Sequence, residues 1–330
     1  MKIRIGYFLG THEDWGGASR ALLNFVRRID RNRFQPIVLV TKRGQLVDQL
    51  ESEGIEWLVW PTHDRGRNPL RYLADIGRAA NFFRRHALQL LHVNFGTIGW
   101  KPPEVLAARL LRIPVINHLH VAFEQPSSFI RYSSSLVAVS QYVADHSESF
   151  GVPTRVIHNL SDLERFVGGV DLRRELGYAE SDVVVAFLGQ MIRVKGLEMF
   201  VDMATRIGDP RARFIVAGPL RKTEGAYSEV EVQELVARDP RIRYLGYRTD
   251  VENLYATSDI IVMPSQWDEP CAMVLFEAAA AGKPVVATVT GGTAEVLRHG
   301  ETGFLVERHD VGGMTECVVR LIQDGELRHR

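Results

Sequence analysis

The feature that most constrains the fold of this chain is the alternation of short apolar segments with longer amphipathic ones. The apolar runs are rich in β-branched residues and show no polar alternation, which is typical of strands in a parallel sheet covered on both faces. In the stretches between them, such as 19–29, apolar residues recur at helical spacing. We therefore expect an α/β fold. The candidate strands are 3–8, 37–40, 56–60, 90–93, 115–119, 136–139, 155–158, 183–188, 213–217, 242–245, 260–263 and 284–287, and the candidate second-half helices are 197–207, 227–237 and 272–281.

The pattern occurs in both halves of the chain, which predicts two domains. With 330 residues the chain is about twice as long as a common single domain. A polar, glycine-containing stretch at 160–178 separates the halves, and we place the domains at 1–165 and 166–330. Each is expected to be a Rossmann-like, doubly wound parallel sheet. A cleft between two such units is the expected ligand site.

Composition narrows the function classes. The chain has 40 basic and 40 acidic residues, so no global charge predicts a nucleic-acid partner. Its two cysteines, Cys271 and Cys317, are too few for a disulfide framework and suit a reducing compartment. No apolar run approaches the roughly 18 to 20 residues that span a bilayer, and the first ten residues read as a strand rather than a signal peptide. We expect a cytoplasmic enzyme.

The most informative stretch is 259–303. A strand is followed by a polar loop, and a helix begins near Cys271 or Ala272 and stops at Gly282 and Pro284. A helix N-terminus at the carboxyl end of a parallel strand favours a phosphate. Glu269 and Glu277 flank that terminus, and their carboxylates would repel an anion unless they face hydroxyl groups on either side of it. The pattern therefore predicts a nucleotide sugar as ligand.

This stretch resembles the retaining glycosyltransferases of family 4, which have the GT-B fold. The family motif of two glutamates separated by seven residues is present as Glu269 and Glu277, with Pro264-Ser265 before it and GKPVVAT and GGTAEV after it. The resemblance implies that Glu269 binds hydroxyls of the donor sugar and that Glu277 binds the ribose. It also implies a donor site that includes Cys271, Ala272, Met273 and Gly292. Cys271-Ala272 replace the usual Phe-Gly, and we interpret Cys271 as a packing residue rather than a nucleophile.

A second match is LGQMIRVKG at 188–196. The family has a lysine here that binds the diphosphate, and Lys195 occupies its position. The family arginine is replaced by Gln190, which can donate hydrogen bonds but carries no charge. Arg193 is a candidate to supply the missing charge from a different position.

Matches in the first domain concern the other side of the expected cleft. Gly16-Gly17 before a helix resemble the family loop that touches the donor phosphate. His120 matches a family histidine near the donor sugar, and we prefer it to His118 on spacing. In the second domain, the base of the nucleotide is expected near Tyr247.

The implied reaction is transfer of a sugar from a UDP- or GDP-sugar to a glycan or lipid-linked acceptor, in the synthesis of cell-surface polysaccharide or glycolipid. Lys195, helix N–H groups and Arg193 would stabilise the departing diphosphate, and no metal cofactor is required. No set of histidines or cysteines has metal-ligand spacing. The alternatives are a nucleotide-sugar epimerase of the same fold and a non-catalytic nucleotide-sugar-binding relative. Family members usually continue into a helix that crosses back onto the first domain, so we expect either a truncated chain or domains tied together less firmly.

A separate feature is the basic helix predicted at 69–86. Arg71, Arg78 and Arg85 recur every seven residues and share one face, whereas Leu70, Leu73, Gly77, Ala80 and Phe83 form an apolar stripe. Such a face could hold an anionic membrane surface and would make the enzyme peripheral on the inner face of the cell membrane. The alternative is an ordinary surface helix packed on the sheet.

Overall fold

A computed structural model describes residues 2–9, 17–60, 69–95, 102–122, 129–159 and 162–330. The chain divides into two compact units, Met1–Ser161 and Asp162–Arg330. The division falls just before α6 (Leu163–Val167), whereas the sequence placed the boundary at 165/166. The reason is that Arg165, at the predicted boundary, donates a 2.6 Å hydrogen bond to Glu252 of the second unit, and the next residue, Phe166, packs edge-on against Tyr255 in that unit's core.

The first unit is built on a seven-stranded sheet whose described pairs are all parallel. The strand order is β3-β2-β1-β4-β5-β6-β7, so the chain builds outward from β1 in one direction and then returns to β4 on its other side. This reversal is the topological switch point of a doubly wound sheet. The strands are β1 (Ile3–Leu9), β2 (Phe34–Val40), β3 (Glu56–Val59), β4 (Leu90–Phe95), β5 (Val115–Leu119), β6 (Ser135–Ala138) and β7 (Thr154–Val156).

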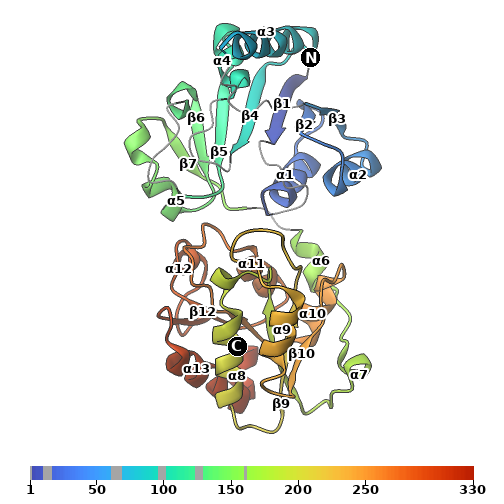
Figure 1. Cartoon of the computed structure of the whole chain (residues 1–330), viewed down its shortest axis with the longest axis vertical. Coiled ribbons are helices and arrows are strands. Elements are labelled where there is room, and N and C mark those ends of the chain that lie inside the picture. Colours follow the sequence, from blue (N-terminus) through green and yellow to red (C-terminus); the bar gives the residue numbers. More distant parts are fainter. Residues whose placement is uncertain (1, 10–16, 61–68, 96–101, 123–128, 160–161) are drawn as a thin grey trace. The chain divides into compact units, whose positions relative to one another are not determined.

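Helices of the first unit connect these strands (Figure 1). On one face, Leu22, Leu23 and Val26 of the first helix pack with Ile5 and Val38 of the sheet, and all five are buried. The helices are α1 (Gly17–Arg28), α2 (Gln45–Ser52), α3 (Pro69–Arg85), α4 (Pro103–Leu110) and α5 (Gln141–Asp145), with short 3-10 turns η1 (Ile130–Tyr132) and η2 (Glu148–Phe150).

The second unit contains a six-stranded parallel sheet in the order β10-β9-β8-β11-β12-β13. Its strands are β8 (Val183–Leu188), β9 (Ala212–Ala217), β10 (Ile242–Tyr244), β11 (Ile260–Met263), β12 (Val285–Thr288) and β13 (Gly303–Val306). Both faces of the central strand β8 are buried, since Val183, Val185 and Phe187 lie in one core cluster and Val184, Ala186 and Leu188 lie in the other. The switch point lies between β8 and β11.

The helices that follow α6 are α7 (Arg173–Leu176), α8 (Leu197–Arg206), α9 (Glu229–Val236), α10 (Val251–Thr257), α11 (Met273–Ala280), α12 (Thr293–Val296), α13 (Val311–Gln323) and α14 (Gly325–His329), with one 3-10 turn, η3 (Arg193–Lys195). These elements confirm the prediction of two Rossmann-like, parallel-sheet domains. The sequence did not predict β13. This strand has only four residues and starts at Gly303, where a Cβ would lie 2.3 Å from the carbonyl oxygen of Val285 on the neighbouring strand.

Helix α3 buries Ala80 and Phe83 of the predicted apolar stripe but exposes its other three residues. Its buried residues are Asp75, Ile76, Ala79, Ala80 and Phe83, whereas Leu70 and Leu73 are 77% and 62% exposed. The stripe is therefore wrong at its N-terminal end. Packing against α4 explains the difference, because Trp60 donates a 2.7 Å hydrogen bond to Glu104 in a buried cluster that Asp75 and Phe82 border.

Candidate active site

The switch point of the second sheet brings together two loops that carry predicted site residues. One follows β8 and contains Gln190 and Lys195, and the other follows β11 and contains Glu269. Because β8 and β11 are parallel neighbours, both loops leave the sheet at its carboxyl edge. This edge at a switch point is where open α/β sheets bind their ligands.

The two loops are pressed against each other through the backbone. The N–H of Gln266 donates to the carbonyl of Val194 at 2.7 Å. Gly196 has a φ of +78°, and a Cβ there would lie 1.9 Å from the carbonyl oxygen of Pro264. Only glycine suits this position, which ends η3 and begins α8. The close contact brings Lys195 beside the second loop.

Lys195 and Glu269 form an ion pair at this edge. The Nζ of Lys195 lies 2.5 Å from Oε1 of Glu269, and 5.4 Å from the centroid of the Trp267 ring. Glu269 is 4% exposed, whereas the side chain of Lys195 is 23% exposed. The pair thus presents a cation and a buried carboxylate at one point, a combination that can bind an anion next to a hydroxyl group.

Glu277 is the fifth of the eight residues of α11. It is 6% exposed, and the hydroxyl of the fully buried Tyr255 donates a 2.8 Å hydrogen bond to its Oε2. The helix begins at Met273, with Ala272 as a cap residue that makes no side-chain hydrogen bond, so the helix starts one to two residues later than predicted. Cys271 is half-buried and lies two residues before the start of the helix.

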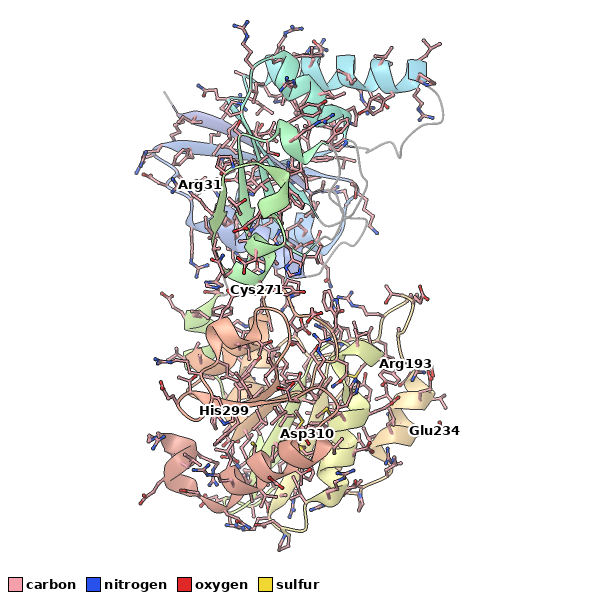
Figure 2. The ribbon with its side chains drawn as sticks, turned by 90° about the vertical axis from the view of Figure 1, so that its left-hand side faces the viewer. Arg31, Arg193, Glu234, Cys271, His299 and Asp310 are labelled. Atoms are coloured by element: carbon pink, nitrogen blue, oxygen red, sulfur yellow. The ribbon has the colours of Figure 1, made fainter. Side chains whose placement is uncertain are left out.

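Arg193 has its guanidinium engaged elsewhere in the second unit. It contacts Glu231 and, at 3.2 Å, Glu198, and it lies 4.6 Å from the ring centroid of Tyr227. In Figure 2, Arg193 lies apart from Cys271, which precedes α11. Gln190 is half-buried and begins a turn in which its carbonyl accepts from the N–H of Ile192 at 2.9 Å. Whether either side chain meets a phosphate stays a prediction.

Two other predicted residues of the second unit are Gly292, which makes a backbone contact, and Tyr247, which is exposed. The N–H of Gly292 donates to the backbone carbonyl of Glu269 at 2.8 Å, so this group holds the loop that carries the carboxylate. The preceding Gly291 has a φ of +46°, and a Cβ there would lie 2.3 Å from the same carbonyl oxygen. Tyr247 is 54% exposed in the loop after β10.

In the first unit, His120 directly follows β5 and belongs to a row of three imidazoles with His118 of β5 and His92 of β4. Its ring stacks on that of His118 with centroids 4.3 Å apart, and Nδ1 of His118 lies 3.4 Å from Nε2 of His92. Nε2 of His120 lies 3.1 Å from Oδ1 of Asn94. Sequence spacing singled out His120 and His118, but not His92 or Asn94. Gly17 is the first residue of α1, and Gly16 lies outside the described residues.

These histidines should make the protein less stable as the pH falls from 7 to 5. Burial lowers the pKa of His92 to about 3 and that of His120 to about 4. Between these values and the pKa of about 6.5 in an unfolded chain, only the unfolded state binds the protons, so the free energy of unfolding decreases with falling pH by up to about 1.4 kcal/mol per unit for each ring. Urea unfolding at several pH values measures this slope.

The variant His92→Phe keeps an aromatic ring against Tyr7, which lies 5.0 Å from His92 between centroids, and removes one titrating group. Its slope between pH 7 and 5 should be shallower than that of the native protein. An equal slope in both proteins would contradict the assignment of the effect to this row.

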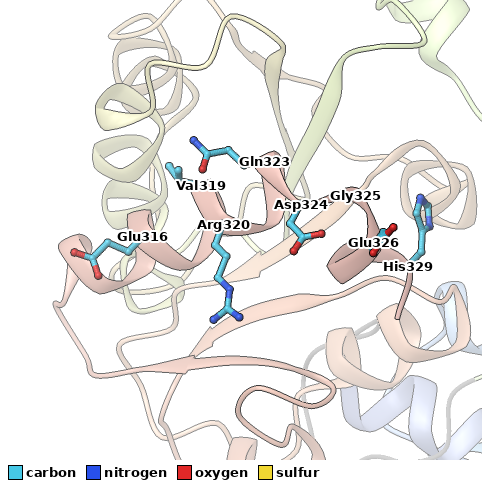
Figure 3. A pocket seen from close by; sticks show the side chains of 8 residues that line it. All are labelled: Glu316, Val319, Arg320, Gln323, Asp324, Gly325, Glu326 and His329. Carbon is cyan, nitrogen blue, oxygen red and sulfur yellow. The ribbon is translucent and has the colours of Figure 1, made fainter.

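A shallow hollow lies elsewhere in the second unit, on α13 and α14 (Figure 3). Glu316, Arg320, Asp324 and His329 are among the residues that line it, and none of the predicted site residues does. Among the described residues, no group of three or more histidine, cysteine, aspartate or glutamate side chains is arranged to hold a metal ion. None of the helices in the described ranges is long and apolar enough to cross a membrane.

Comparison with known proteins decides the family. Residues 182–324 match the model for glycosyl transferases group 1, and residues 15–165 match the model for glycosyltransferase family 4, so together the two models cover most of the chain. This chain belongs to the family 4 glycosyltransferases. It is a transferase enzyme with the GT-B fold.

Relatives and solved structures of this family extend the comparison. N-acetyl-alpha-D-glucosaminyl L-malate synthase of Bacillus anthracis is 29% identical over 78% of this chain and 71% of its own length. D-inositol 3-phosphate glycosyltransferase of Corynebacterium jeikeium is 31% identical over 58% of this chain and 50% of its own length. The crystal structure of Anabaena HepE in complex with UDP is 24% identical, has a TM-score of 0.82 and covers 99% of this chain and 92% of that one, which is a likeness of fold.

Proposed function

We propose that this glycosyltransferase is a retaining enzyme that transfers a sugar from a UDP- or GDP-sugar to a glycan or lipid-linked acceptor. The observation that carries the proposal is the ion pair of Lys195 and Glu269 at the switch point of the second sheet, with the buried Glu277 on the helix that follows. The complexes of Anabaena HepE with UDP and with UDP-glucose support a nucleotide sugar as donor.

Each site residue has a distinct part in the proposal. Lys195 binds the diphosphate, Glu269 binds hydroxyls of the sugar, and Glu277 binds the ribose hydroxyls. The backbone around Cys271, Ala272 and Met273 faces the phosphates, because the start of α11 offers N–H groups and the positive end of the helix dipole. The other members proposed for the donor site are Gly16, Gly17, His120, Gln190, Arg193, Tyr247 and Gly292.

The proposed reaction needs no nucleophile on the protein. The bond between the sugar C1 and the diphosphate oxygen breaks, and its electron pair leaves with the diphosphate. The acceptor oxygen bonds to C1 on the same face, and its proton passes to the departing phosphate oxygen. Lys195 stabilises the charge that develops on that oxygen, which is the largest contribution a protein usually makes to such a step. Glu269 orients the donor, so a sugar trapped covalently on Glu269 would contradict this mechanism.

Calorimetric titration with UDP, GDP and ADP tests the donor class. We expect one nucleotide to bind with a micromolar dissociation constant, and its sugar nucleotides then define the panel for acceptor screening. Binding without turnover on any acceptor would favour a non-catalytic relative. That alternative is considered because Gln190 and Ala272 depart from the family pattern. Conversion of the donor into an isomeric sugar nucleotide would favour an epimerase.

We further propose that α3 docks on an anionic membrane from the cytoplasmic side. Leu70 and Leu73 are exposed on this helix, and Arg71, Arg78 and Arg85 are exposed along it. Exposed leucines beside arginines are typical of helices that lie in the interface of a bilayer with anionic lipids. A lipid-linked acceptor would then be presented at the first unit.

Reversal of the three arginines to glutamate should abolish binding to anionic vesicles at low salt, because each basic residue near the surface contributes about 1 kcal/mol. Vesicle co-sedimentation measures the bound fraction. The matched control reverses Arg174, Arg206 and Arg298, which are exposed on the second unit. Absence of binding by the native protein, or equal loss in both triple variants, would end this part of the proposal.

A further inference from the structure

We infer that Ser265 is a positioning residue that holds the carboxylate of Glu269 in the orientation needed for a donor sugar. This inference rests on the proposed function and adds a residue to it. Ser265 lies two residues beyond the end of β11 and is fully buried. A buried hydroxyl at the carboxyl edge of the sheet needs a hydrogen-bond partner, and the partner it has is a site residue.

The hydroxyl of Ser265 has one proton and three acceptors within reach. Its Oγ lies 2.7 Å from Oε1 of Glu269, 3.2 Å from the carbonyl oxygen of Val194 and 3.4 Å from that of Trp267. Of the three acceptors, the carboxylate lies at the shortest distance and is the only one that carries a charge. Hydrogen bonds to charged groups are stronger than those to neutral groups. The proton therefore goes to Glu269.

Lys195 and Ser265 contact the same oxygen of Glu269. Nζ of Lys195 lies 2.5 Å from Oε1 and Oγ of Ser265 lies 2.7 Å from it. Within the described part of the chain, no side chain is seen to donate to Oε2, which leaves that oxygen to accept from a ligand hydroxyl. When Lys195 turns toward a diphosphate, Ser265 remains as the group that fixes the carboxylate.

The backbone of Ser265 is itself anchored to the next strand. The hydroxyl of Thr288, at the end of β12, donates to the carbonyl of Ser265 at 2.5 Å, and Thr288 is fully buried. Strand β12 thus anchors the loop after β11, and Ser265 in this loop contacts the carboxylate of Glu269. The two hydroxyl groups therefore have different roles. That of Thr288 fixes the loop, whereas that of Ser265 fixes the side chain of Glu269.

The test is the affinity of Ser265→Ala for UDP-glucose and for UDP, with GDP-mannose and GDP in parallel. Loss of a hydrogen bond to a carboxylate should weaken binding of the sugar nucleotide by about tenfold or more, and binding of the nucleoside diphosphate should change by less than about twofold. In a Glu269→Gln background the same change should have little further effect, since Ser265 acts through that carboxylate. Sugar release from the donor, as kcat and KM, is the second readout.

Thr288→Val is the matched control. It removes an equally buried hydroxyl whose contacts are with backbone carbonyls, so it should lower the melting temperature and leave the ratio of the two affinities unchanged. Equal weakening of both ligands by Ser265→Ala, or an equal effect in the Glu269→Gln background, would show a merely structural role and overturn this inference alone. Failure of the native protein to bind any of the four ligands would overturn the proposed function, and this inference with it.

Discussion

Replacement of Lys195 by alanine should lower kcat/KM for the donor by about 10²- to 10³-fold. Removal of one group that stabilises developing negative charge typically costs this much. The native geometry suits such a role, because the side chain of Lys195 is partly exposed and its ammonium group is held beside Glu269 at the carboxyl edge of β8 and β11. Steady-state rates of sugar release from the donor measure the change.

A companion variant to Lys195→Ala is Arg193→Ala, two residues earlier in η3. The guanidinium of Arg193 is engaged with Glu198 and Glu231. If Arg193 supplies the charge that the family arginine would bring to the position of Gln190, its loss should reduce kcat/KM substantially as well, and Gln190→Arg should restore part of it. A native rate in Lys195→Ala would contradict the proposed role of the lysine.

Replacement of Glu277 by alanine should raise the dissociation constant of the preferred nucleoside diphosphate by about tenfold or more. A carboxylate that accepts hydrogen bonds from ribose hydroxyls contributes about 1.5 to 3 kcal/mol, and each 1.4 kcal/mol is tenfold in affinity. Isothermal titration calorimetry on the native and variant proteins measures the difference.

Glu277 also has a structural contact, which the design must separate from binding. It accepts from the hydroxyl of Tyr255 at 2.8 Å in a buried setting, so alanine leaves that hydroxyl without this acceptor. Glu277→Gln keeps an acceptor oxygen for Tyr255 and removes the charge, and Tyr255→Phe removes the hydroxyl and keeps the carboxylate. Equal nucleotide affinity in the native protein and Glu277→Gln would argue against a carboxylate–ribose contact.

Sequence patterns predicted the regular elements of the sheets well and their edges less well. Apolar runs such as 183–188 and 260–263 coincide with β8 and β11 because a strand buried on both faces leaves a continuous signal. The apolar run in β13 is shorter, with three residues at 304–306 after Gly303. On α3, periodicity placed Leu70 and Leu73 on the buried stripe, but contact with α4 decides which face is covered.

Some residues of the candidate site could be predicted from the sequence, and others could not. Glu269, Glu277 and Lys195 stand out in the sequence because each belongs to a run with a local meaning: a strand end, a helix start or a glycine turn. For Ser265, the sequence showed only that it precedes the motif, and it did not indicate a role for its hydroxyl group. Its place in the site depends on the hydrogen bond to Glu269 and on Thr288, which comes from another strand.

The sequence by itself determined the class of fold, the two-domain organisation and the family resemblance, and it predicted the three charged residues that we propose for the donor site. These properties depend on spacing within short segments, where each residue constrains its near neighbours. Only the tertiary structure decided that β8 and β11 are adjacent, that Arg193 pairs with Glu231, and that Ser265 and Lys195 share one oxygen of Glu269. These contacts join residues from separate strands and loops, and they form because burial in a parallel sheet brings the carboxyl ends of its strands to a common edge.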